Sequence, residues 1–583
     1  MNRIALAFLL LFSAFSVFAQ NVKFKIIETT DVHGAVYPYD FKTERPLKGS
    51  LAHVSAMLKE ERADENQKVI LLDNGDFLQG TPAVYYYNFE KPDEKHLYAE
   101  VMNYLSYEVS TVGNHDVETG HKVYDKFRKE INFPWLAANA VDVKSGKPYF
   151  QPYHVFEKEG VKFVALGLIT PGVPNWLPPK IYEGIEFEDM IKTARKWVKI
   201  IEEKEKPDVL IGLFHSGVDF TYGGETAETP RNENASQLVA EQVPGFDIVF
   251  VGHDHHGWNK RTKDPNGKET LLLGGTSRAR NVAVADLVFD LKEKKIISLK
   301  GEIVDMSGYQ PDADFLLKFE PQFDKINEYV SRPLGVFSSE VKSSDALFGP
   351  SKFTQLINKV QMELSGADVS FTAPLSFNAT IDSGTIYVRD LFKLYHYENL
   401  LYTIKLSGKE IKDYLEYCAA GWFNRMENEN DHLLNFKKDK NGKVIYSERT
   451  GSSALATSYY NYDAAFGINY TVDVSKPSGE RVKISDLSNG GKFRLDKTYK
   501  VAVNSYRGNG GGGHLVKGAK IPKEELTGRI ISSTEKDLRF YIMKWIEKMK
   551  TVEVTSDFNW EVIPEKFWKA GKERDFKLLF QNR

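Results

Sequence analysis

Short apolar runs alternate with longer amphipathic stretches through the first 300 residues of the chain. Six of these runs are rich in Val, Ile, Leu and Phe, as buried β-strands usually are. They cover residues 24–27, 69–72, 109–112, 162–169, 209–214 and 247–251. Residues 282–290 predict a further strand, and the stretches between the runs have the spacing of helices. The alternation predicts an α/β layered domain over residues 20–308.

The pattern changes after residue 308. Apolar positions at helical spacing predict a linker helix within 309–333, where Pro321 marks either a kink or the first turn. The pattern beyond it predicts helices at 353–364, 408–418 and 535–548 and strands at 368–372 and 401–406. The polar stretch 424–453 predicts an excursion loop or hairpin with a turn at 439–442. We therefore expect a second domain over residues 334–583.

The first 19 residues differ from the rest of the chain. Arg3 precedes a mostly apolar run, and Val17-Phe18-Ala19 suits a cleavage site, so the pattern predicts a secretory signal peptide over 1–19. A membrane anchor is the alternative, but the run is short for a span of about 20 residues. We expect a mature chain that starts at Gln20, is exported to the periplasm or secreted by a bacterium, and has no contact with a membrane.

Composition narrows the class of protein. Lys and Arg number 77 and Asp and Glu 80, so the net charge of −3 argues against a partner that is a nucleic-acid polymer. It leaves a small nucleotide ligand open. The 42% of hydrophobic residues excludes disorder of the whole chain. Cys418 is the only cysteine, which excludes an internal disulfide and a cysteine-based zinc site.

Carboxylate, amide and imidazole side chains recur where the predicted strands end. In chain order they are Asp31, His33, Asp76, Asn114, His215, His253 and His255. Ligands bind outside the carboxyl ends of strands in open α/β sheets, so these side chains are expected at one edge. A single His or Asp at a strand end is more often a cap or a turn former. Seven of them together favour a metal site.

The chemistry of these residues favours two divalent metal ions. Oxygen and imidazole ligands without a thiolate suit Zn²⁺, Mn²⁺ or Fe²⁺. Two ions about 3.5–4 Å apart are a common device for displacement at phosphorus. One carboxylate must then bridge the ions, and Asp76 stands centrally in the order of ligands.

These motifs resemble the ordered signature of the calcineurin-like metallophosphoesterases. The motifs are Asp31-Val32-His33, Gly75-Asp76, Gly113-Asn114-His115-Asp116, His215 and Gly252-His253-Asp254-His255. The resemblance implies one metal held by Asp31, His33, Asp76 and His255. It implies a second metal held by Asp76, Asn114, His215 and His253. His115 would face the substrate phosphate and assist the leaving oxygen rather than bind a metal.

A carboxylate is expected to orient His115. In the nucleotidase branch of the family this residue lies three positions after the catalytic His, where this chain has Glu118 instead of the commoner aspartate. Either carboxylate can accept a hydrogen bond from an imidazole N–H. Asp116 is the alternative that lies nearer in sequence.

Two segments of the second domain carry aromatic residues that could hold a base. They are 395–399, which contains Tyr397 and Asn399, and 504–513, which contains Tyr506, Arg507 and a run of four Gly. Two rings can sandwich a flat base, each stack contributing about 1–3 kcal/mol. In a chain with 29 Tyr, a pair of tyrosines is more often core or interface.

Residues 333–560 look like the C-terminal domain of the periplasmic 5′-nucleotidases and their 2′,3′-cyclic-nucleotide relatives. The resemblance implies that Tyr397 and Tyr506 clamp the base, with Asn399 and Arg507 beside the substrate. The 5′-nucleotidase branch usually has a glycine-rich segment ending in a substrate-binding arginine. Here Thr372-Ala373-Pro374-Leu375-Ser376-Phe377 stands in its place, which looks more like the 2′,3′-cyclic-nucleotide 2′-phosphodiesterase/3′-nucleotidase branch.

The resemblance therefore implies a fold and a function. The expected fold is a four-layer α/β metallophosphoesterase sandwich followed by an α+β domain of the 5′-nucleotidase type. The expected function is an exported two-metal hydrolase of 2′,3′-cyclic or 3′ nucleotides, with 5′-nucleotides or UDP-sugars as alternative substrates. A nucleotide-binding protein without turnover is a further alternative, but it would not need His115 beside Asn114.

Overall fold

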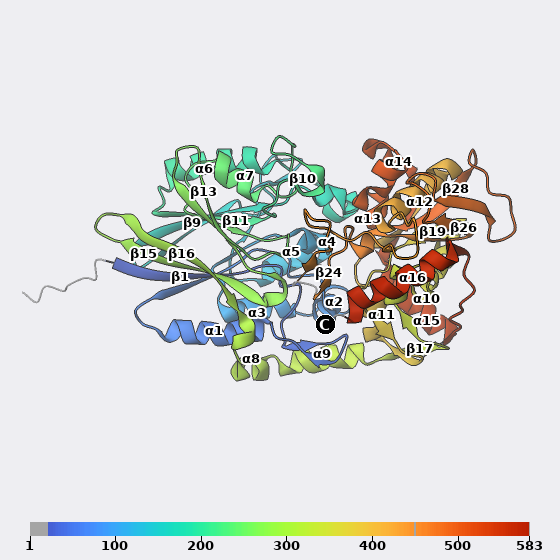
Figure 1. Ribbon diagram of the computed structural model, residues 1–583. Helices are drawn as coiled ribbons and strands as arrows, with labels where there is room; N and C mark the ends of the chain where they lie inside the picture. Colours follow the sequence, from blue (N-terminus) through green and yellow to red (C-terminus); the bar gives the residue numbers. More distant parts are fainter. Residues whose placement is uncertain (1–20, 448–450, 582–583) are drawn as a thin grey trace, which may run out of the picture.

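Two halves of the chain, joined by a pair of helices, make up the protein as Figure 1 shows it. The computed structural model describes residues 21–447 and 451–581. The predicted signal peptide, residues 1–19, lies outside the described residues. The first half is a stack of helices and sheets, and the second half is built around a smaller sheet.

The first half contains two six-stranded sheets. The first sheet has the order β16-β15-β1-β4-β5-β6. Its strands are β16 (Lys295–Asp305), β15 (Asn281–Asp290), β1 (Asn21–Thr29), β4 (Lys68–Asp73), β5 (Val109–Thr111) and β6 (Trp135–Leu136). The second has the order β13-β14-β12-β11-β9-β8. Its strands are β13 (Trp258–Lys263), β14 (Glu269–Gly274), β12 (Ile248–Val251), β11 (Val209–His215), β9 (Val161–Ile169) and β8 (Tyr153–Lys158).

The two sheets pack face to face between two layers of helices. Buried side chains of both sheets, among them Phe24, Ile70, Phe163 and Ile211, form the core between them. Helices α1 (Leu51–Ala63), α3 (Leu97–Leu105) and α5 (His121–Glu130) cover the outer face of the first sheet. Helices α6 (Met190–Lys204) and α7 (Ser236–Gln242) cover the outer face of the second. This four-layer arrangement confirms the predicted fold class of the first half.

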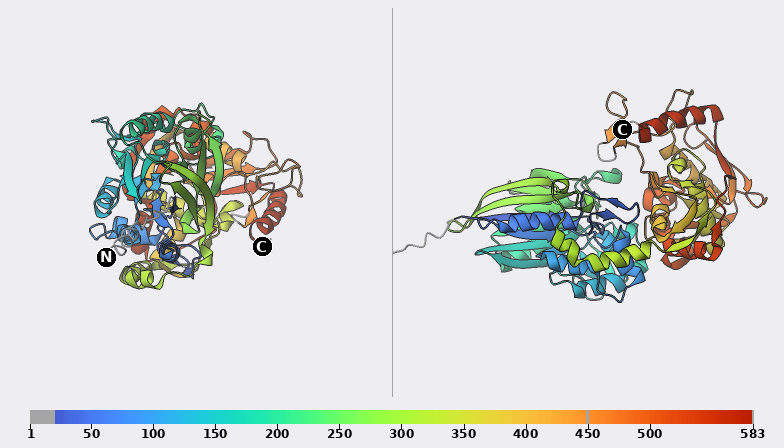
Figure 2. Two further views of the ribbon diagram at one scale, coloured as in Figure 1. Left: turned by 90° about the vertical axis from the view of Figure 1, so that its left-hand side faces the viewer. Right: turned by 90° about the horizontal axis from the view of Figure 1, so that it is seen from below.

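The linker consists of two short helices rather than one. They are α8 (Ala313–Lys318) and α9 (Glu320–Val330), and Pro321 lies in the first turn of α9. A proline is tolerated in a first turn because its missing N–H has no partner there. Both helices run along the first half and lead into the second (Figure 2).

The second half has a five-stranded mixed sheet of order β25-β19-β28-β22-β29. Its strands are β25 (Ala464–Phe466), β19 (Val369–Thr372), β28 (Thr498–Asn504), β22 (Leu400–Ser407) and β29 (Ile530–Asp537). Helices α10 (Lys352–Ser365), α12 (Gly408–Trp422) and α15 (Leu538–Met549) pack against it. The prediction of a helix from residue 535 was wrong at its start. Strand β29 runs to Asp537, whose side chain caps α15 by accepting a hydrogen bond from Phe540 N at 3.1 Å.

A tyrosine of the first half is buried among residues of the second. Tyr85 ends helix α2 (Pro82–Tyr85) and packs in the apolar cluster of α10, α11 (Val388–Leu394) and α15. Its hydroxyl donates to Asp537 Oδ2 at 3.0 Å. The Arg539 guanidinium carbon lies 4.7 Å from the centre of the Tyr85 ring and 4.2 Å from that of Phe392. The two halves are therefore packed together at a buried cation–aromatic contact.

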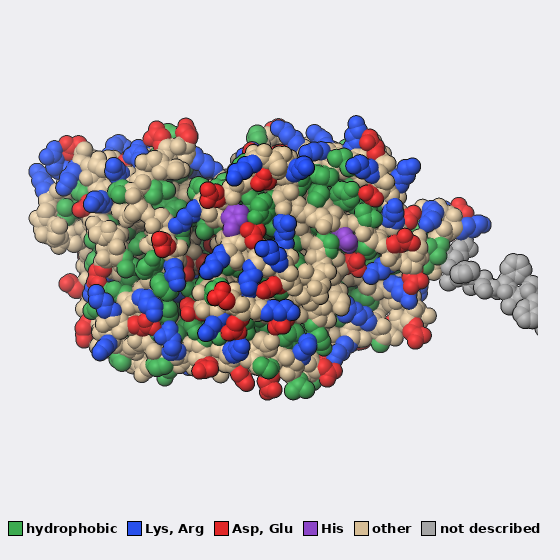
Figure 3. Space-filling view, turned by 180° about the vertical axis from the view of Figure 1, so that it is seen from behind, with side chains coloured by type: hydrophobic (Ala, Val, Ile, Leu, Met, Phe, Trp, Pro, Cys, Tyr) green, Lys and Arg blue, Asp and Glu red, His purple; other side chains and the backbone are tan. Residues whose placement is uncertain are grey.

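The surface of the protein carries both signs of charge. On the face of the described residues that Figure 3 shows, Lys and Arg side chains are interspersed with Asp and Glu over both halves. None of the helices in residues 21–447 and 451–581 is long and apolar enough to cross a membrane.

Candidate metal centre

The seven predicted metal ligands come together at the carboxyl ends of strands from both sheets. They follow or end β1, β4 and β5 in the first sheet and β11 and β12 in the second. Two groups form, in each of which the ligand atoms lie within 4.8 Å of one another. The first is Asp31, His33 and His255, and the second is Asp76, His215 and His253. The ligand residues therefore come from strands of both sheets, and the strand ends of either sheet alone would supply only some of them.

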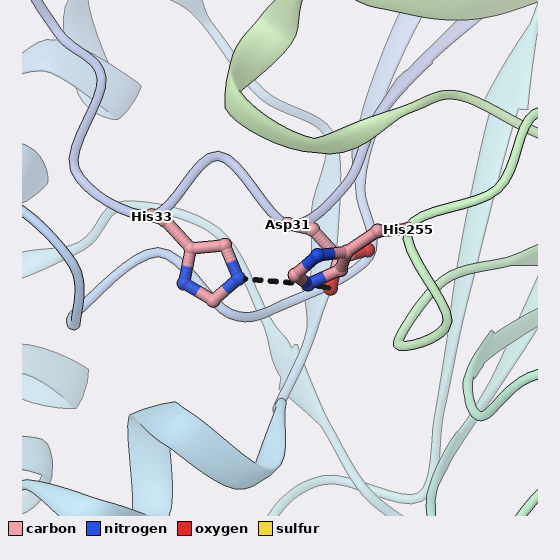
Figure 4. A group of neighbouring side chains, drawn as sticks. All are labelled: Asp31, His33 and His255. Atoms are coloured by element: carbon pink, nitrogen blue, oxygen red, sulfur yellow. Dashed lines mark hydrogen bonds and ion pairs between the residues drawn. The ribbon is translucent and has the colours of Figure 1, made fainter. Parts of the chain in front are cut away.

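The first group is shown in Figure 4, where the rings of His33 and His255 turn toward each other beside Asp31. Their Nε2 atoms lie 3.0 Å apart, and His255 Nε2 is 3.3 Å from Asp31 Oδ1. Asp31 is fully buried. Two imidazole nitrogens and a carboxylate oxygen therefore converge on one point.

The amide of Asn114 contacts two members of the second group. His215 Nε2 lies 3.1 Å from Asp76 Oδ2. Asn114 Oδ1 lies 3.2 Å from His215 Nε2 and 2.9 Å from His253 Nδ1. The structure thus brings all four residues predicted for the second metal into contact. The bridging role of Asp76 remains a prediction.

The far side of three of these imidazole rings is fixed by a hydrogen bond. His33 Nδ1 donates to Gln79 O at 3.2 Å, and His215 Nδ1 donates to Asn74 O at 2.6 Å. His253 Nε2 lies 3.1 Å from Glu233 Oε1. Such bonds set the tautomer and orient the other nitrogen toward the centre.

Electrostatics of the first group favour the forms that bind cations, whereas in the second group burial opposes protonation of His215 but Asp76 raises its pKa to about 10. Burial opposes ionisation of Asp31, but the His255 ring holds the pKa of this carboxyl below its usual range. Asp76 is also buried, and His215 holds its pKa well below the ordinary value. Burial and the charge of His255 lower the pKa of His33 to about 3. Ionised carboxylate oxygens beside an uncharged imidazole, with no thiolate, fit a divalent cation.

The backbone at the centre is held in an unusual conformation. Five ligands have a positive φ between 47° and 76°; they are Asp31, His33, Asp76, His253 and His255. A non-glycine residue in this region costs about 1–3 kcal/mol and tends to persist at functional sites. Gly113 permits the close approach of the loops, because a Cβ there would lie 2.1 Å from Asp76 Oδ1.

Asp116 has a different role from the one that its place in the sequence allowed. Its carboxylate is fully buried and accepts hydrogen bonds from four backbone N–H groups. The donors are Asp76, Phe77, Leu78 and Gly113, at 2.8–3.0 Å. Asp116 therefore joins the loop after β4 to the loop after β5.

Glu118 is the carboxylate that contacts His115. Both residues lie on the short helix α4 (Asn114–Glu118), and His115 Nδ1 is 2.5 Å from Glu118 Oε2. The centroid of the His115 ring lies 5.5 Å from that of His33. Burial opposes protonation of His115, but Asp76 and Glu118 together raise its pKa to about 9. A protonated imidazole beside the ligand groups can donate a proton to a leaving oxygen.

The two predicted base-binding tyrosines lie in half-buried positions on the second half. Tyr397 follows α11, and Tyr506 belongs to the short helix α13 (Ser505–Gly508). Tyr460 adds a third ring, whose centroid is 6.4 Å from that of Tyr397. The ring of Tyr506 packs over Gly511, where a Cβ would meet it at 2.5 Å. The close approach to this ring explains Gly511, and the other three glycines of the run, 510, 512 and 513, have positive φ angles of 71–101°.

Arg507 lies in a position that does not support the expected contact with substrate. It is buried, and its guanidinium makes a two-point ion pair with Asp463 at 2.9 and 3.1 Å. Its remaining N–H groups donate to Asn461 Oδ1, Gly511 O and Tyr460 O. All five donors of the guanidinium are used within the protein. Arg507 therefore holds the loops of this half together.

Asn399 is 9% exposed, and its contacts lie within the second half, to which it belongs. Its carbonyl accepts a hydrogen bond from Leu538 N at 2.8 Å. The neighbouring Glu398 pairs with Arg539 at 3.0 Å. A role of Asn399 toward substrate remains a prediction.

Three residues of the centre carry no strong signal in the sequence. Gln79 and Glu233 hold imidazole rings through a carbonyl and a carboxylate, and neither lies in a motif. Trp176 lies in a Pro- and Gly-containing loop after β9, with its ring centroid 5.5 Å from that of His253. Asn509 of the second half donates to Trp176 O at 3.3 Å. The only sequence feature that could have indicated one of these three residues is the position of Trp176 in a loop that follows a strand.

Two family profiles match the chain. Residues 24–257 match the profile described as calcineurin-like phosphoesterase. Residues 333–518 match the profile described as 5′-nucleotidase, C-terminal domain. The first match covers every residue of the two ligand groups, and the second covers Tyr397 and Tyr506.

Several curated proteins are similar over most of the chain. The 2′,3′-cyclic-nucleotide 2′-phosphodiesterase/3′-nucleotidase of Haemophilus influenzae is 26% identical over 93% of this chain and 88% of its own length. The protein of the same name from Salmonella typhimurium is 28% identical over 85% of this chain and 83% of its own. The trifunctional nucleotide phosphoesterase YfkN of Bacillus subtilis is 26% identical over 94% of this chain. The chain spans only 39% of the length of YfkN.

Solved structures share the fold. A Staphylococcus aureus protein determined in complex with alpha-ketoglutarate superposes with a TM-score of 0.75 at 21% identity, covering 93% of this chain and 99% of that one. The 5′-nucleotidase precursor of Thermus thermophilus has a TM-score of 0.62 at 21% identity, covering 93% and 100%. At this identity the likeness establishes the fold alone.

The first prediction concerns metal content. Asp76→Ala removes the carboxylate predicted to bridge both groups, so it should lower the occupancy of both sites. His33→Ala should affect mainly one, because His33 contacts only the first group. Elemental analysis of the purified variants measures both. Asp125→Ala is the control, because Asp125 belongs to neither ligand group and its carboxylate instead contacts His121 Nδ1 at 3.1 Å. Two metals per chain in Asp76→Ala would contradict the bridge.

The second prediction concerns His115. His115→Ala should leave the metal content nearly intact and lower kcat by about 10²–10⁴, the usual contribution of general acid–base catalysis. Glu118→Gln should lower kcat less, because an amide can still contact the ring. His121→Ala provides the control imidazole on the adjacent helix. Near-normal turnover of His115→Ala would remove this residue from the mechanism, and loss of metal would make it a ligand.

Proposed function

Because the chain belongs to the metallophosphoesterases that join a calcineurin-like domain to a 5′-nucleotidase C-terminal domain, we propose that it hydrolyses nucleotide phosphoesters with two divalent metal ions. One observation supports this most directly. Two groups of metal-ligand residues lie at the same strand ends as the His115–Glu118 pair. A binding protein would need the ligands but not an imidazole paired with a carboxylate beside them.

The ligand residues would hold the ions, and the roles follow the two groups. Asp31, His33 and His255 would bind one ion, and Asn114, His215 and His253 the other, with Asp76 shared between them. Bound divalent cations of the Zn, Mn or Fe type supply Lewis-acid activation of water and of phosphoryl oxygens.

His115 is the residue that we propose to move a proton. Its Nδ1 donates to Glu118 Oε2, which leaves Nε2 as the nitrogen available to substrate. As the bond from phosphorus to the ribose oxygen breaks, Nε2 gives its proton to that oxygen. Glu118 keeps the ring in this orientation and stabilises its positive charge. Water then reprotonates the imidazole.

The second half would supply recognition of the base. Tyr397 and Tyr506 offer aromatic faces, and Tyr460 lies beside Tyr397. Both tyrosines are half-buried, so stacking can exclude water from one face of a base. Trp176 of the first half lies between the metal centre and Asn509 of the second. Base recognition and hydrolysis would thus take place in one site formed by both halves.

Among nucleotides we propose 2′,3′-cyclic and 3′ nucleotides as the preferred substrates. Two relatives that match over 85–93% of the chain are named for that activity. The segment Thr372-Ala373-Pro374 also lacks the substrate arginine expected of the 5′-nucleotidase branch. We propose export as well, on the pattern of the first 19 residues.

A release assay tests this function. The full chain, loaded with a defined metal, is given 2′,3′-cyclic AMP, 3′-AMP, 5′-AMP and UDP-glucose, and the products are separated by chromatography. We expect the highest kcat/KM for the first two substrates. A preference for 5′-AMP or UDP-glucose would assign the chain to another branch. Tight binding without release would make it a binding protein.

The third prediction separates recognition of the base from chemistry. Tyr397→Ala and Tyr506→Ala should each weaken nucleotide binding by about 1–3 kcal/mol, the range for one stacked base. Turnover of p-nitrophenyl phosphate, which has no nucleobase, should scarcely change. Tyr499→Ala is the control, because Tyr499 is a core residue at 1% exposure and its loss should lower the melting temperature and harm both substrates. Equal losses on both substrates in the clamp variants would exclude the clamp.

A further inference from the structure

Two cationic side chains near the first ligand group have no anionic partner among the described residues. Lys42 lies in the turn between β2 (Tyr39–Asp40) and β3 (Arg45–Pro46), and Arg278 lies in the turn after β14. Both are half-buried, and both line one cavity of about 20 Å³. Over residues 21–447 and 451–581, the Lys42 ammonium and the Arg278 guanidinium have no hydrogen-bond or ion-pair partner. Such groups are usually paired when they leave water.

The cavity adjoins the metal centre. Its lining includes Gly34, which follows the ligand His33. The backbone N–H of Arg278 donates to the carbonyl of Asp31 at 2.8 Å, so the turn of Arg278 is attached to a ligand residue. A cavity of this size holds about one water molecule. A larger anion would therefore lie at its rim, between the two cations and the first ligand group.

Two carboxylates, those of Asp40 and Glu398, lie close enough to act on the charge of Lys42, but neither forms an ion pair with it. Asp40 accepts hydrogen bonds from the Lys42 backbone N–H at 3.0 Å and from the Thr43 hydroxyl at 2.9 Å. Glu398, from the second half, pairs with Arg539 at 3.0 Å. Asp40 lines the same cavity and keeps its negative charge, because both of its donors are neutral, so Lys42 and Arg278 leave a net excess of one positive charge among these three residues.

The positive charge of Lys42 and Arg278 is among the causes that shift the pKa of neighbouring groups. Burial and the charge of Arg278 lower the pKa of Lys42 to about 8. Burial, with Lys42 and Arg278, also holds the pKa of His396 well below its usual range. Arg278 has a positive φ of 63°, a strained conformation that tends to mark a functional position.

A neighbouring arginine shows the ordinary arrangement. Arg389 lies across the same β2–β3 turn and pairs with Glu44. Its guanidinium also lies 4.8 Å from the centre of the Tyr387 ring. A carboxylate partner is therefore present for a cation in this part of the fold, yet Lys42 and Arg278 have none among the described residues.

We propose that Lys42 and Arg278 form a subsite for a second phosphate group of the substrate, beside the phosphate under attack and on the side of Asp31, His33 and His255. The proposal rests on the proposed function, because it needs a phosphoester at the metal centre. Arg offers a planar fork of N–H donors to phosphate oxygens, and Lys a mobile point charge. The subsite would favour nucleotides with two phosphates, carried either as a diphosphate or at separate ribose positions.

Inhibition of a baseless substrate tests the subsite. The full chain, with a fixed excess of its metal, hydrolyses p-nitrophenyl phosphate in the presence of orthophosphate or pyrophosphate. In Lys42→Met and Arg278→Met the inhibition constant of pyrophosphate should rise about 10-fold or more, the usual effect of losing a charge-assisted hydrogen bond. The constant of orthophosphate and the turnover of p-nitrophenyl phosphate should change less than about twofold.

Arg389→Met is the matched control, because it removes a nearby cation that is already paired, and it should leave both constants unchanged. Unchanged pyrophosphate inhibition in the Lys42 and Arg278 variants would overturn the subsite. Equal weakening of orthophosphate would overturn it as well, since both residues would then serve the attacked phosphate. If wild-type protein hydrolysed neither p-nitrophenyl phosphate nor a nucleotide, the proposed function would fail instead.

Two further substrates identify how the second phosphate is carried. The variants are compared on adenosine 3′,5′-bisphosphate and on ADP, with 3′-AMP as the single-phosphate reference. A selective loss of kcat/KM on the bisphosphate supports recognition across the ribose, and a selective loss on ADP supports recognition of a diphosphate. Losses equal to that on 3′-AMP with both substrates would contradict the subsite.

Discussion

The candidate metal centre depends on one buried carboxylate that belongs to neither ligand group. Asp116 accepts four backbone hydrogen bonds and so fixes the loop after β4 against the loop after β5. Two further backbone bonds, Asp31 N to Gly75 O and His33 N to Asp76 O, each 2.9 Å, attach the loop after β1 to the same point. Three loops are thus joined by hydrogen bonds that use none of the ligand side chains. This preorganisation explains how the ligands can keep left-handed backbone conformations that short loops would otherwise avoid.

The ligands could be predicted from the sequence because their signal is local. Each follows an apolar run that reads as a strand, and parallel strands place their carboxyl ends on a common edge. The division of the strands between two sheets could not be predicted in the same way. The pattern of apolar and polar residues along a strand shows which face is buried, but it does not show which other strand lies beside it in a sheet. The choice between Asp116 and Glu118 was open for the same reason. Both lie on one turn of helix, and only the fold decides which carboxylate faces the backbone and which faces His115.

The second half shows where sequence reasoning fails. An arginine next to a tyrosine and a run of glycines suggests an anion site, but Arg507 is satisfied by Asp463 and three oxygen acceptors. Those partners lie more than 40 residues away or are backbone carbonyls, so no spacing in the sequence announces them. Lys42 and Arg278 are the reverse case. Neither lies in a motif, and they stand out only because the fold brings two unpaired cations to one cavity.

The burial of Tyr85 determines which parts of this protein must stay together when the chain is cut or recombined. The residue belongs by sequence to the first half, yet its ring completes an apolar cluster of the second and stacks on the Arg539 guanidinium. A fragment cut at the linker would leave the first half with an exposed aromatic side chain and the second with a hole beside a buried arginine. A chimera that exchanges one half for that of a relative would therefore need to take α2 and the surface against which Tyr85 packs from the same protein. The boundary for recombination lies within the contact between the halves, not at the linker helices that divide them in sequence.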